Sequence, residues 1–511
     1  MLGLFSNKSD HPLANLKSAQ QLLDDLPKGD PVEVLQEVGD WIEELFDPEN
    51  SFRMDHQFAV LRMLDEAIQP YLRKIIYSYF AVVEPPAFKE KRLWRAMNGY
   101  YTYTEVGYLH LIRSLQNGEK GSSSVRPHLA MISARGILAV FGRLEGSAVR
   151  YAQIDPLLWL HLAEFYTLAE IEHCQDEIIP FYPGLTAQTS VQHLLASVLM
   201  WYSVGVGVFK PLDLHISKCL IIHMCQSFSI TEHFETGSQF VFDLKNATSP
   251  ARVTVDGAMY PGSSRFMSIG AVNGQLDNLL KTLAKNIVPD GLNFGVAYSA
   301  EAVAEVVLRL TILCQSTLPT RKHTRRQIKM DVNVLNGFFN VIEKTRAGER
   351  VSSTESESWD VEDMSATGLR CVLPAALANN VKIGTLLGIK PEKGEYWGAG
   401  VVRRLRRDEQ NNLHIGVRIL ANKVLNVMVI DPDGGPEAQH TALLLDRTDE
   451  QGSESWMLMK PDTFSISRSP TMMLDKQSYL LMPLALVERG EDFDLVRYRK
   501  MTHDTGSDNI Y

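Results

Sequence analysis

The chain has few cysteines for its length. Among 511 residues there are five, and no two of them form a CxxC pair. A disulfide framework needs more cysteines at closer and more regular spacing. The sequence therefore excludes a disulfide-stabilised scaffold, and we expect the reducing environment of the cytoplasm.

Long apolar runs and an excess of positive charge are also missing. The longest uncharged apolar run, Leu194–Phe209, has 16 residues, fewer than the ~20 that a membrane-spanning helix needs. We expect a buried helix there and no membrane span, and we expect no signal peptide because no charged region precedes the first apolar stretch. The formal net charge of −10 argues against a protein whose whole surface binds nucleic acid or an anionic membrane.

Residues 1–319 are predicted to form an all-α domain. Their hydrophobic residues recur at spacings of three and four, as in amphipathic helices. Short connections with Pro and Gly breakers predict antiparallel helical hairpins, arranged as a bundle or stacked as a solenoid. Residues 237–264 alternate apolar and polar and are expected to form a β-hairpin-like insertion. The predicted helices are Pro31–Phe46, Met54–Phe80, Arg92–Leu115, Ala130–Arg143, Leu157–Glu177, Val191–Val204, Leu212–Phe228, Leu276–Ile287 and Ala300–Cys314.

After Pro319 the pattern changes to the period of two that is typical of strands. Ile328, Met330, Val332 and Val334 alternate with polar residues, which predicts a half-buried strand. Further short strands between turn residues predict a small antiparallel barrel over residues 320–431. Residues 432–511 continue in β style and are expected to be an extension of the barrel or a second small β domain. The other strands are predicted at Ile383–Ile389, Ala399–Leu405, Leu413–Leu420 and Val424–Ile430.

Two arginines and an acid–hydroxyl–glycine element flank the first strand. Arg321 and Arg325 precede it in TRKHTRR, and Asp363, Ser365 and Gly368 follow it as D-x-S-x-x-G. An arginine can bond the O6 and N7 edge of guanine, stack on a base or bind phosphate. A carboxylate accepts from the N1–H and amino groups of guanine, and a glycine permits close backbone approach or a positive φ. These residue types suit a guanine nucleotide that carries phosphodiester charges.

The arrangement resembles the PilZ domain, a six-stranded β-barrel that is the bacterial receptor for cyclic di-GMP. The likeness rests on RKHTR, the alternating strand after it, DMSATGL and the late strand HIGVRIL at His414–Leu420. It covers residues 320–431, about a fifth of the chain. One departure is the long polar loop Glu343–Glu357, which we expect to extend a hairpin.

The resemblance implies a role for each candidate residue. The arginines would hold the guanines and phosphates, the acid and the hydroxyl would contact a guanine, and the glycine would shape the turn beneath it. The predicted ligand-binding residues are Arg321, Arg325, Asp363, Ser365 and Gly368, with Arg326 as an additional candidate.

The function that this resemblance implies is that of a cyclic di-GMP-binding effector, with neither catalytic activity nor a cofactor or metal. No P-loop, GxGxxG, GxSxG or HExxH motif appears, and no GGDEF, EAL or HD-GYP motif that would make or degrade the nucleotide. We expect the nucleotide to order the Arg321–Arg326 linker on the barrel and so to reorient the helical domain, which signals to a protein partner. The alternative is a constitutive protein-interaction scaffold with an inert PilZ-like barrel.

The helical part offers two weaker candidates for a metal site. His215, Cys219 and His223 recur every four residues, a spacing that could place zinc or iron ligands on one helix face. Their neighbours are apolar, however, and a buried cysteine packs as a small hydrophobe. Glu170 and His173 have the Glu-x-x-His spacing of di-iron bundles, but the further ligands of such a site are not evident. Core packing is therefore favoured over a helical metalloprotein.

A run of arginines, RRLRR at residues 403–407, lies on a predicted strand of the barrel. Alternation would place Arg404 and Arg406 on one face, and Arg403 and Arg407 on the other with Leu405. A solvated edge that discourages sheet aggregation is the favoured interpretation. A contribution to the field around an anionic ligand is the alternative.

Overall fold

The computed structural model describes most of the chain as two compact units. One unit comprises Met1–Arg150 and Ile154–Pro319, and the other comprises Tyr151–Gln153 and Thr320–Tyr511. Each unit is described by itself below. The described residues are 11–27, 29–81, 85–183, 188–254, 259–292, 298–315, 324–347, 355–378, 381–431, 439–446, 454–474 and 477–502.

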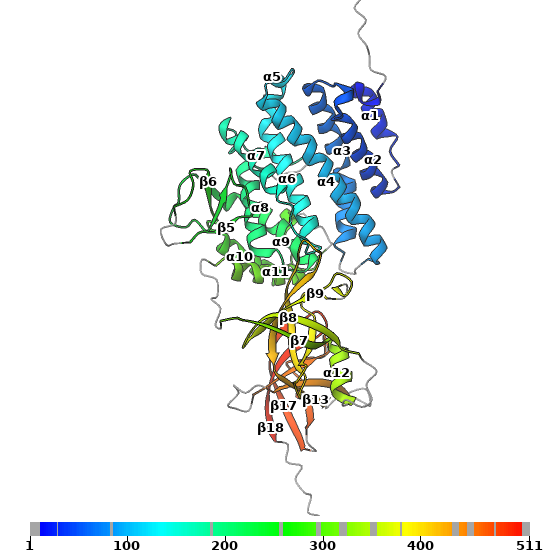
Figure 1. Ribbon diagram of the computed structural model, residues 1–511, viewed down its shortest axis with the longest axis vertical. Helices are drawn as coiled ribbons and strands as arrows, with labels where there is room; N and C mark the ends of the chain where they lie inside the picture. Colours follow the sequence, from blue (N-terminus) through cyan, green and yellow to red (C-terminus); the bar gives the residue numbers. More distant parts are fainter. Residues whose placement is uncertain are drawn as a thin grey trace, which may run out of the picture. The chain divides into compact units, whose positions relative to one another are not determined.

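The first unit is helical (Figure 1, blue to green), which confirms the predicted fold class of this part. All nine predicted helices are present, most of them with small shifts at their ends. Two are shorter than expected: the helix predicted at Leu157–Glu177 ends at Ile171, and the one predicted at Leu212–Phe228 ends at His223. The α-helices among the described residues of this unit are α1 Leu16–Asp24, α2 Pro31–Leu45, α3 Met54–Tyr79, α4 Ala87–Gln116, α5 Ser122–Val125, α6 Leu129–Ala148, α7 Leu157–Ile171, α8 Val191–Gly205, α9 Pro211–His223, α10 Val272–Leu283 and α11 Ala300–Leu313.

Local chemistry explains where several of these helices begin. The Asp30 carboxylate accepts from the N–H of Val32 at 2.9 Å ahead of α2, and Pro31 occupies the first turn of that helix. Ser190 caps α8 by accepting from the N–H of His193 at 3.2 Å. Such caps satisfy N–H groups that have no partner within the helix.

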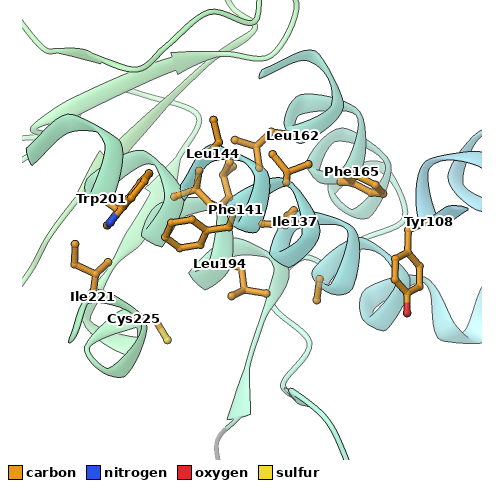
Figure 2. Packing of buried hydrophobic residues seen from close by; sticks show 14 of the residues in the cluster. Tyr108, Ile137, Phe141, Leu144, Leu162, Phe165, Leu194, Trp201, Ile221 and Cys225 are labelled. Carbon is orange, nitrogen blue, oxygen red and sulfur yellow. The ribbon is translucent and has the colours of Figure 1, made fainter. Parts of the chain in front are cut away.

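Helix α6 lies at the centre of the helical core. Figure 2 shows its Ile137, Phe141 and Leu144 packed among side chains of α7 and α8, including Phe165 and Trp201. A Cβ at Gly136 of α6 would lie 2.2 Å from the Phe165 ring. Glycine therefore lets α7 approach α6 more closely than any other residue would allow.

A four-stranded antiparallel sheet stands where a hairpin-like insertion was expected. Its order is β3-β6-β4-β5, and its first strand begins before the predicted segment. Phe240 and Phe242 on one face of β4 are buried in the helical core. The strands are β3 Ser229–Thr231, β4 Phe240–Asp243, β5 Ala251–Arg252 and β6 Ser264–Ser268, and a separate two-stranded pair is formed by β1 Ile179–Pro180 and β2 Gln188–Thr189.

The second unit begins with a closed six-stranded antiparallel barrel of order β10-β11-β12-β9-β8-β7. Alternate residues of its strands, among them Val332, Trp359 and Ile415, fill the barrel interior. Where the segment Glu343–Glu357 was expected to extend a hairpin, helix α12 (Phe338–Ala347) occupies its start, and residues 348–354 lie outside the described residues. The strands are β7 Arg326–Asn336, β8 Glu357–Ser365, β9 Gly368–Leu373, β10 Leu386–Pro391, β11 Gly398–Arg407 and β12 Leu413–Ala421.

A second closed six-stranded antiparallel barrel follows (Figure 1, orange to red), with the order β13-β14-β15-β18-β17-β16. The predicted fold class, a PilZ-like barrel with an additional β unit after an all-α region, is therefore confirmed. One strand belongs elsewhere than expected: β13, grouped with the first barrel at Val424–Ile430, pairs with β14 and β16. The strands are β13 Lys423–Ile430, β14 Gln439–Asp446, β15 Glu454–Met459, β16 Thr471–Leu474, β17 Gln477–Arg489 and β18 Asp494–Thr502.

The two barrels share an apolar interface. Leu335, Val341 and Val401 of the first barrel and its helix lie in one buried cluster with Leu443 and Leu495 of the second barrel. Asp492, between β17 and β18, accepts from the backbone N–H of Phe338 at 2.5 Å and of Leu386 at 2.9 Å. Apolar burial and these backbone bonds hold the barrels together. Among the described residues of the chain, no helix is both long and apolar enough to cross a membrane.

Candidate ligand-binding site

The acid–hydroxyl–glycine element forms one corner of the first barrel. Asp363 lies on β8, Ser365 ends β8, and Gly368 begins β9 directly opposite Ser365. The Ser365 hydroxyl donates to the backbone oxygen of Gly368 at 3.2 Å. The tight turn through Ala366 and Thr367 thus brings the three motif residues together.

Gly368 is required by close approach rather than by its backbone angles. Its φ does not lie in the left-handed region, but a Cβ at this position would lie 2.8 Å from the backbone oxygen of Val417 on β12. Real Cβ atoms do not come so close to a carbonyl oxygen, so only glycine fits beside β12 here.

The arginine segment reaches this corner. The guanidinium of Arg325 donates from Nη1 to Oδ1 of Asp363 at 2.7 Å, with 31% of the arginine side chain and 18% of the aspartate side chain exposed. Arg326, the first residue of β7, is exposed opposite Met364. Arg321 lies outside the described residues. The structure therefore joins one predicted arginine to the predicted acid.

Two β-bulges shape the strands beside Asp363. Glu362 is an extra residue on β8, between the pairs Val361 with Cys371 and Asp363 with Arg370. Strand β7 has an extra residue in the same region, between its pairs with Asp363 and Val361. A bulge re-aims side chains and increases local twist. Here it gives Asp363 and Arg370 neighbouring positions on the outer face of the barrel.

A groove of about 1110 Å³ runs along this face. It is slightly larger than the ~300–1,000 Å³ of usual ligand pockets, as a dinucleotide would need. Its walls carry both signs of charge, so they offer acceptors for base N–H groups and donors for phosphates. The lining residues are Gln327, Ile328, Lys329, Met330, Asp331, Asp360, Val361, Glu362, Asp363, Arg370, Val372 and Glu392.

Comparison with protein-family models gives matches to the N-terminal helical part and to the first barrel. Residues 17–230 match the N-terminal domain of the cyclic-di-GMP receptor FimW, and residues 316–424 match its middle PilZ domain. Residues 316–424 belong to the PilZ family. The two matches together span more than half of the chain, and both names describe a receptor, a binding role rather than a catalytic one. A search of curated proteins returned no match to the chain.

The PilZ domain carries further residues beside its motif, of which the sequence analysis singled out only Arg404. Across the barrel, Asp363 pairs with Arg370, Arg370 with Gly416, and Gly416 with Arg404. These residues share the outer face, and a Cβ at Gly416 would lie only 3.1 Å from the Cβ of Arg404. Alternation in HIGVRIL, with Ile415 and Val417 buried, was the signal that placed Gly416 outward.

Arg370 of the PilZ domain is held by two neighbours. Its Nε donates to Glu362 at 2.8 Å, and its Nη2 lies 2.9 Å from Nδ1 of His414. The other nitrogen of that imidazole, Nε2, lies 3.1 Å from Oδ2 of Asp408. An imidazole that accepts at Nδ1 and donates at Nε2 satisfies both partners. This network fixes Arg370 at the wall of the groove.

The arginine run 403–407 lies beside β12, whereas the pairing of β11 with β10 ends at Val401. Leu405 is buried, and Arg404 and Arg406 are exposed, as alternation predicts. Arg403, however, is an extra residue between the pairs of Val402 and Arg404, so simple alternation does not place it. The interpretation as a solvated edge therefore stays a prediction.

The carboxylates of the groove affect the pKa of a thiol inside the PilZ barrel. Burial, together with the nearby carboxylates of Asp360, Asp363 and Glu362, raises the pKa of the Cys371 thiol to about 12. Cys371 lies directly under the groove, in the barrel interior. A thiol with so high a pKa is unreactive at neutral pH, which leaves it a role in packing.

The weaker candidates in the helical unit are engaged in internal contacts. Nδ1 of His215 lies 3.0 Å from Glu145, and its ring stacks on Phe80 at a centroid distance of 4.3 Å. Glu170 forms an ion pair with Arg265. The described parts of the chain contain no group of three or more His, Cys, Asp or Glu side chains that could hold a metal ion.

Proposed function

We propose that this protein is a cyclic di-GMP-binding effector whose PilZ domain holds the nucleotide at Arg321, Arg325, Asp363, Ser365 and Gly368, with Arg326 as an additional contact. The observation that carries the proposal is the contact of Arg325 with Asp363 at the Ser365–Gly368 corner. The match to the middle PilZ domain of a cyclic-di-GMP receptor supports it. No catalytic step and no cofactor are part of this proposal.

The ligand would exchange one ion pair for several bonds. The Arg325–Asp363 pair is partly exposed, and such pairs contribute only about 0.2–1 kcal/mol. Guanine offers two acceptors, O6 and N7, to an arginine and two N–H donors to a carboxylate. Both partners of the pair therefore form a charge-assisted hydrogen bond to guanine when it enters. The remaining guanidinium groups of the site donate to the phosphates.

The nucleotide fixes the Arg321–Arg326 segment against the barrel. This segment also connects the helical domain to the PilZ domain in the sequence, so fixing it changes the orientation of one domain relative to the other. The free energy for the change comes from the higher affinity of the ligand for the fixed state. The helical domain then signals to a protein partner, in the cytoplasm, where the nucleotide is produced.

The test is isothermal titration calorimetry of the full chain with cyclic di-GMP, with cyclic di-AMP as the control ligand. We expect binding of cyclic di-GMP alone, and its loss or a large weakening in Arg321→Ala and in Asp363→Ala, because each variant removes a charge-assisted contact. Glu409→Ala, an exposed residue in the turn between β11 and β12, serves as the matched control. Undiminished affinity in both site variants contradicts the assignment. Absence of binding by the unmodified chain, with unchanged solution scattering, favours the scaffold instead.

A further inference from the structure

A carboxylate of the second barrel is held between two arginines of the PilZ domain. Glu488, on β17, accepts from Nη2 of Arg418 at 2.7 Å and from Nη2 of Arg403. The glutamate side chain is 20% exposed, against 44% for Arg418 and 33% for Arg403. Two guanidinium groups that converge on one anion are the arrangement with which proteins bind carboxylates and phosphates.

These arginines lie next to the ligand-binding corner. Arg418 on β12 stands directly opposite Gly368 of β9, which stands opposite Ser365 of β8. Neighbouring strands are ~4.8 Å apart, so the backbone of Arg418 is about 10 Å from that of Ser365. A cyclic dinucleotide that contacts Ser365 therefore extends within reach of the Arg418 side chain.

The contact is also placed at the border of the interface between the barrels. Val401, which pairs with Arg418, and Leu495, which pairs with Glu488, both lie in the buried cluster that joins the barrels. β17 has a bulge at this point, between Leu486 and Glu488, and bulges re-aim side chains. The second barrel thus presents its carboxylate at the edge of the ligand face.

We infer that Arg403 and Arg418 form an anion subsite for a phosphodiester group of cyclic di-GMP, and that Glu488 occupies this subsite when the nucleotide is absent. The inference rests on the proposed function. The carboxylate and the phosphodiester are both singly charged anions that accept from the same guanidinium groups, so only one of them is fully bonded at a time. The second barrel therefore acts as a built-in competitor of the ligand, and binding releases this contact while Asp492 and the apolar cluster keep the barrels joined.

Calorimetry with cyclic di-GMP tests the competition through Glu488→Gln, which removes the charge but keeps the shape of the side chain. We expect affinity about two- to five-fold higher than that of the unmodified chain, which is the range that partly exposed ion pairs give. Glu454→Gln is the matched control, because Glu454 pairs with Arg497 within the second barrel at 3.4 Å. In the Arg418→Gln, Arg403→Gln background the substitution of Glu488 should give no gain.

A second measurement does not depend on substitutions. Hydrogen–deuterium exchange of the unmodified chain should rise in the β17 segment around Glu488 when cyclic di-GMP is added, since the ligand displaces the carboxylate. The inference is overturned if the unmodified chain binds the nucleotide but Glu488→Gln binds it no more tightly and exchange at β17 stays unchanged. Absence of binding by the unmodified chain overturns the proposed function itself, so the two failures are distinguishable.

Discussion

The substitution Gly368→Ala probes how closely the motif corner is built against β12. An added Cβ would lie 2.8 Å from the backbone oxygen of Val417, whereas ordinary contacts begin at 3.4 Å. Because the obstacle is backbone, β9 and β12 must separate by about 0.6 Å to accept it. Forcing an extra methyl group into a close-packed position costs about 1–3 kcal/mol.

Part of this cost is offset, since alanine loses less conformational entropy on folding than glycine, by about 0.5–1 kcal/mol. We expect a net loss of roughly 0.5–2 kcal/mol in the free energy of unfolding. At ~2–4 °C per kcal/mol for a unit of this size, the melting temperature falls by roughly 1–8 °C. Ser365, bonded to the displaced backbone at Gly368, moves with it, and affinity for cyclic di-GMP should fall at least about tenfold.

The assays are scanning calorimetry for stability and titration calorimetry for affinity. Gly99→Ala is the matched control, because no atom lies within 4 Å of a Cβ at that helical position, and it should keep the affinity and stabilise α4 slightly. If Gly368→Ala melts and binds like the unmodified chain, the claim that close approach to Val417 requires glycine is refuted.

Two further predictions concern the interior of each unit. Asp492→Ala leaves the N–H groups of Phe338 and Leu386 without their acceptor, which should lower the free energy of unfolding by about 1–3 kcal/mol for each buried group. Urea denaturation should show this loss, and Asp492→Asn should recover part of it. Equal stability of Asp492→Ala and the unmodified chain would contradict the prediction. In the helical unit, burial disfavours the charged forms of Glu145 and His215, but their charged neighbours outweigh it. Lys218 and His215 lower the pKa of Glu145 below its usual 4.5. Cys219 and Glu145 raise the pKa of His215 above its usual 6.5. The stability from Glu145 is present above pH 4.5 and lost as the pH falls below it, and that from His215 is present below pH 6.5 and lost as the pH rises towards its raised pKa. The free energy of unfolding, measured by denaturation with helical circular dichroism, should therefore be highest between pH 4.5 and pH 6.5. Glu145→Gln should flatten this pH profile and lower the free energy of unfolding by about 3–5 kcal/mol in that range, since it leaves buried positive charge unpaired. A variant with an unchanged profile would contradict this pairing.

Periodicity predicted the helices because apolar residues recur along each of them at helical spacing, although a central helix such as α6 is buried on most of its surface. It could not predict α12, since the buried apolar residues described in it are few, Phe338, Val341 and Ile342, and polar residues follow them. The strand at Val424–Ile430 was predicted as a strand but grouped with the first barrel. Alternation says which residues face inward and nothing about which partner strands they meet.

The same limit applies to the candidate site. The motif pattern predicted the acid, the hydroxyl and the glycine, and the structure brings them together with Arg325. The neighbours of these residues depend on register and bulges that no local pattern encodes. Arg370 lies beside Asp363 because of the register between β8 and β9, and Gly416 lies beside Arg370 because of the register between β9 and β12. Glu488 reaches Arg418 from 70 residues away in the sequence, where neither residue type nor spacing marks it.

The direct passage from β12, which ends at Ala421, to β13, which begins at Lys423, leaves Asn422 as the only residue between the two barrels. A connection this short cannot act as a tether between independent bodies, so the β13 strand is an anchor for β12, the strand that carries Gly416 and Arg418. The match to the PilZ family model ends at residue 424, yet Leu443 and Leu495 beyond it pack in one buried cluster with residues of the PilZ barrel. The packed unit is therefore larger than the matched family domain, and the PilZ barrel is stabilised by the barrel that follows it.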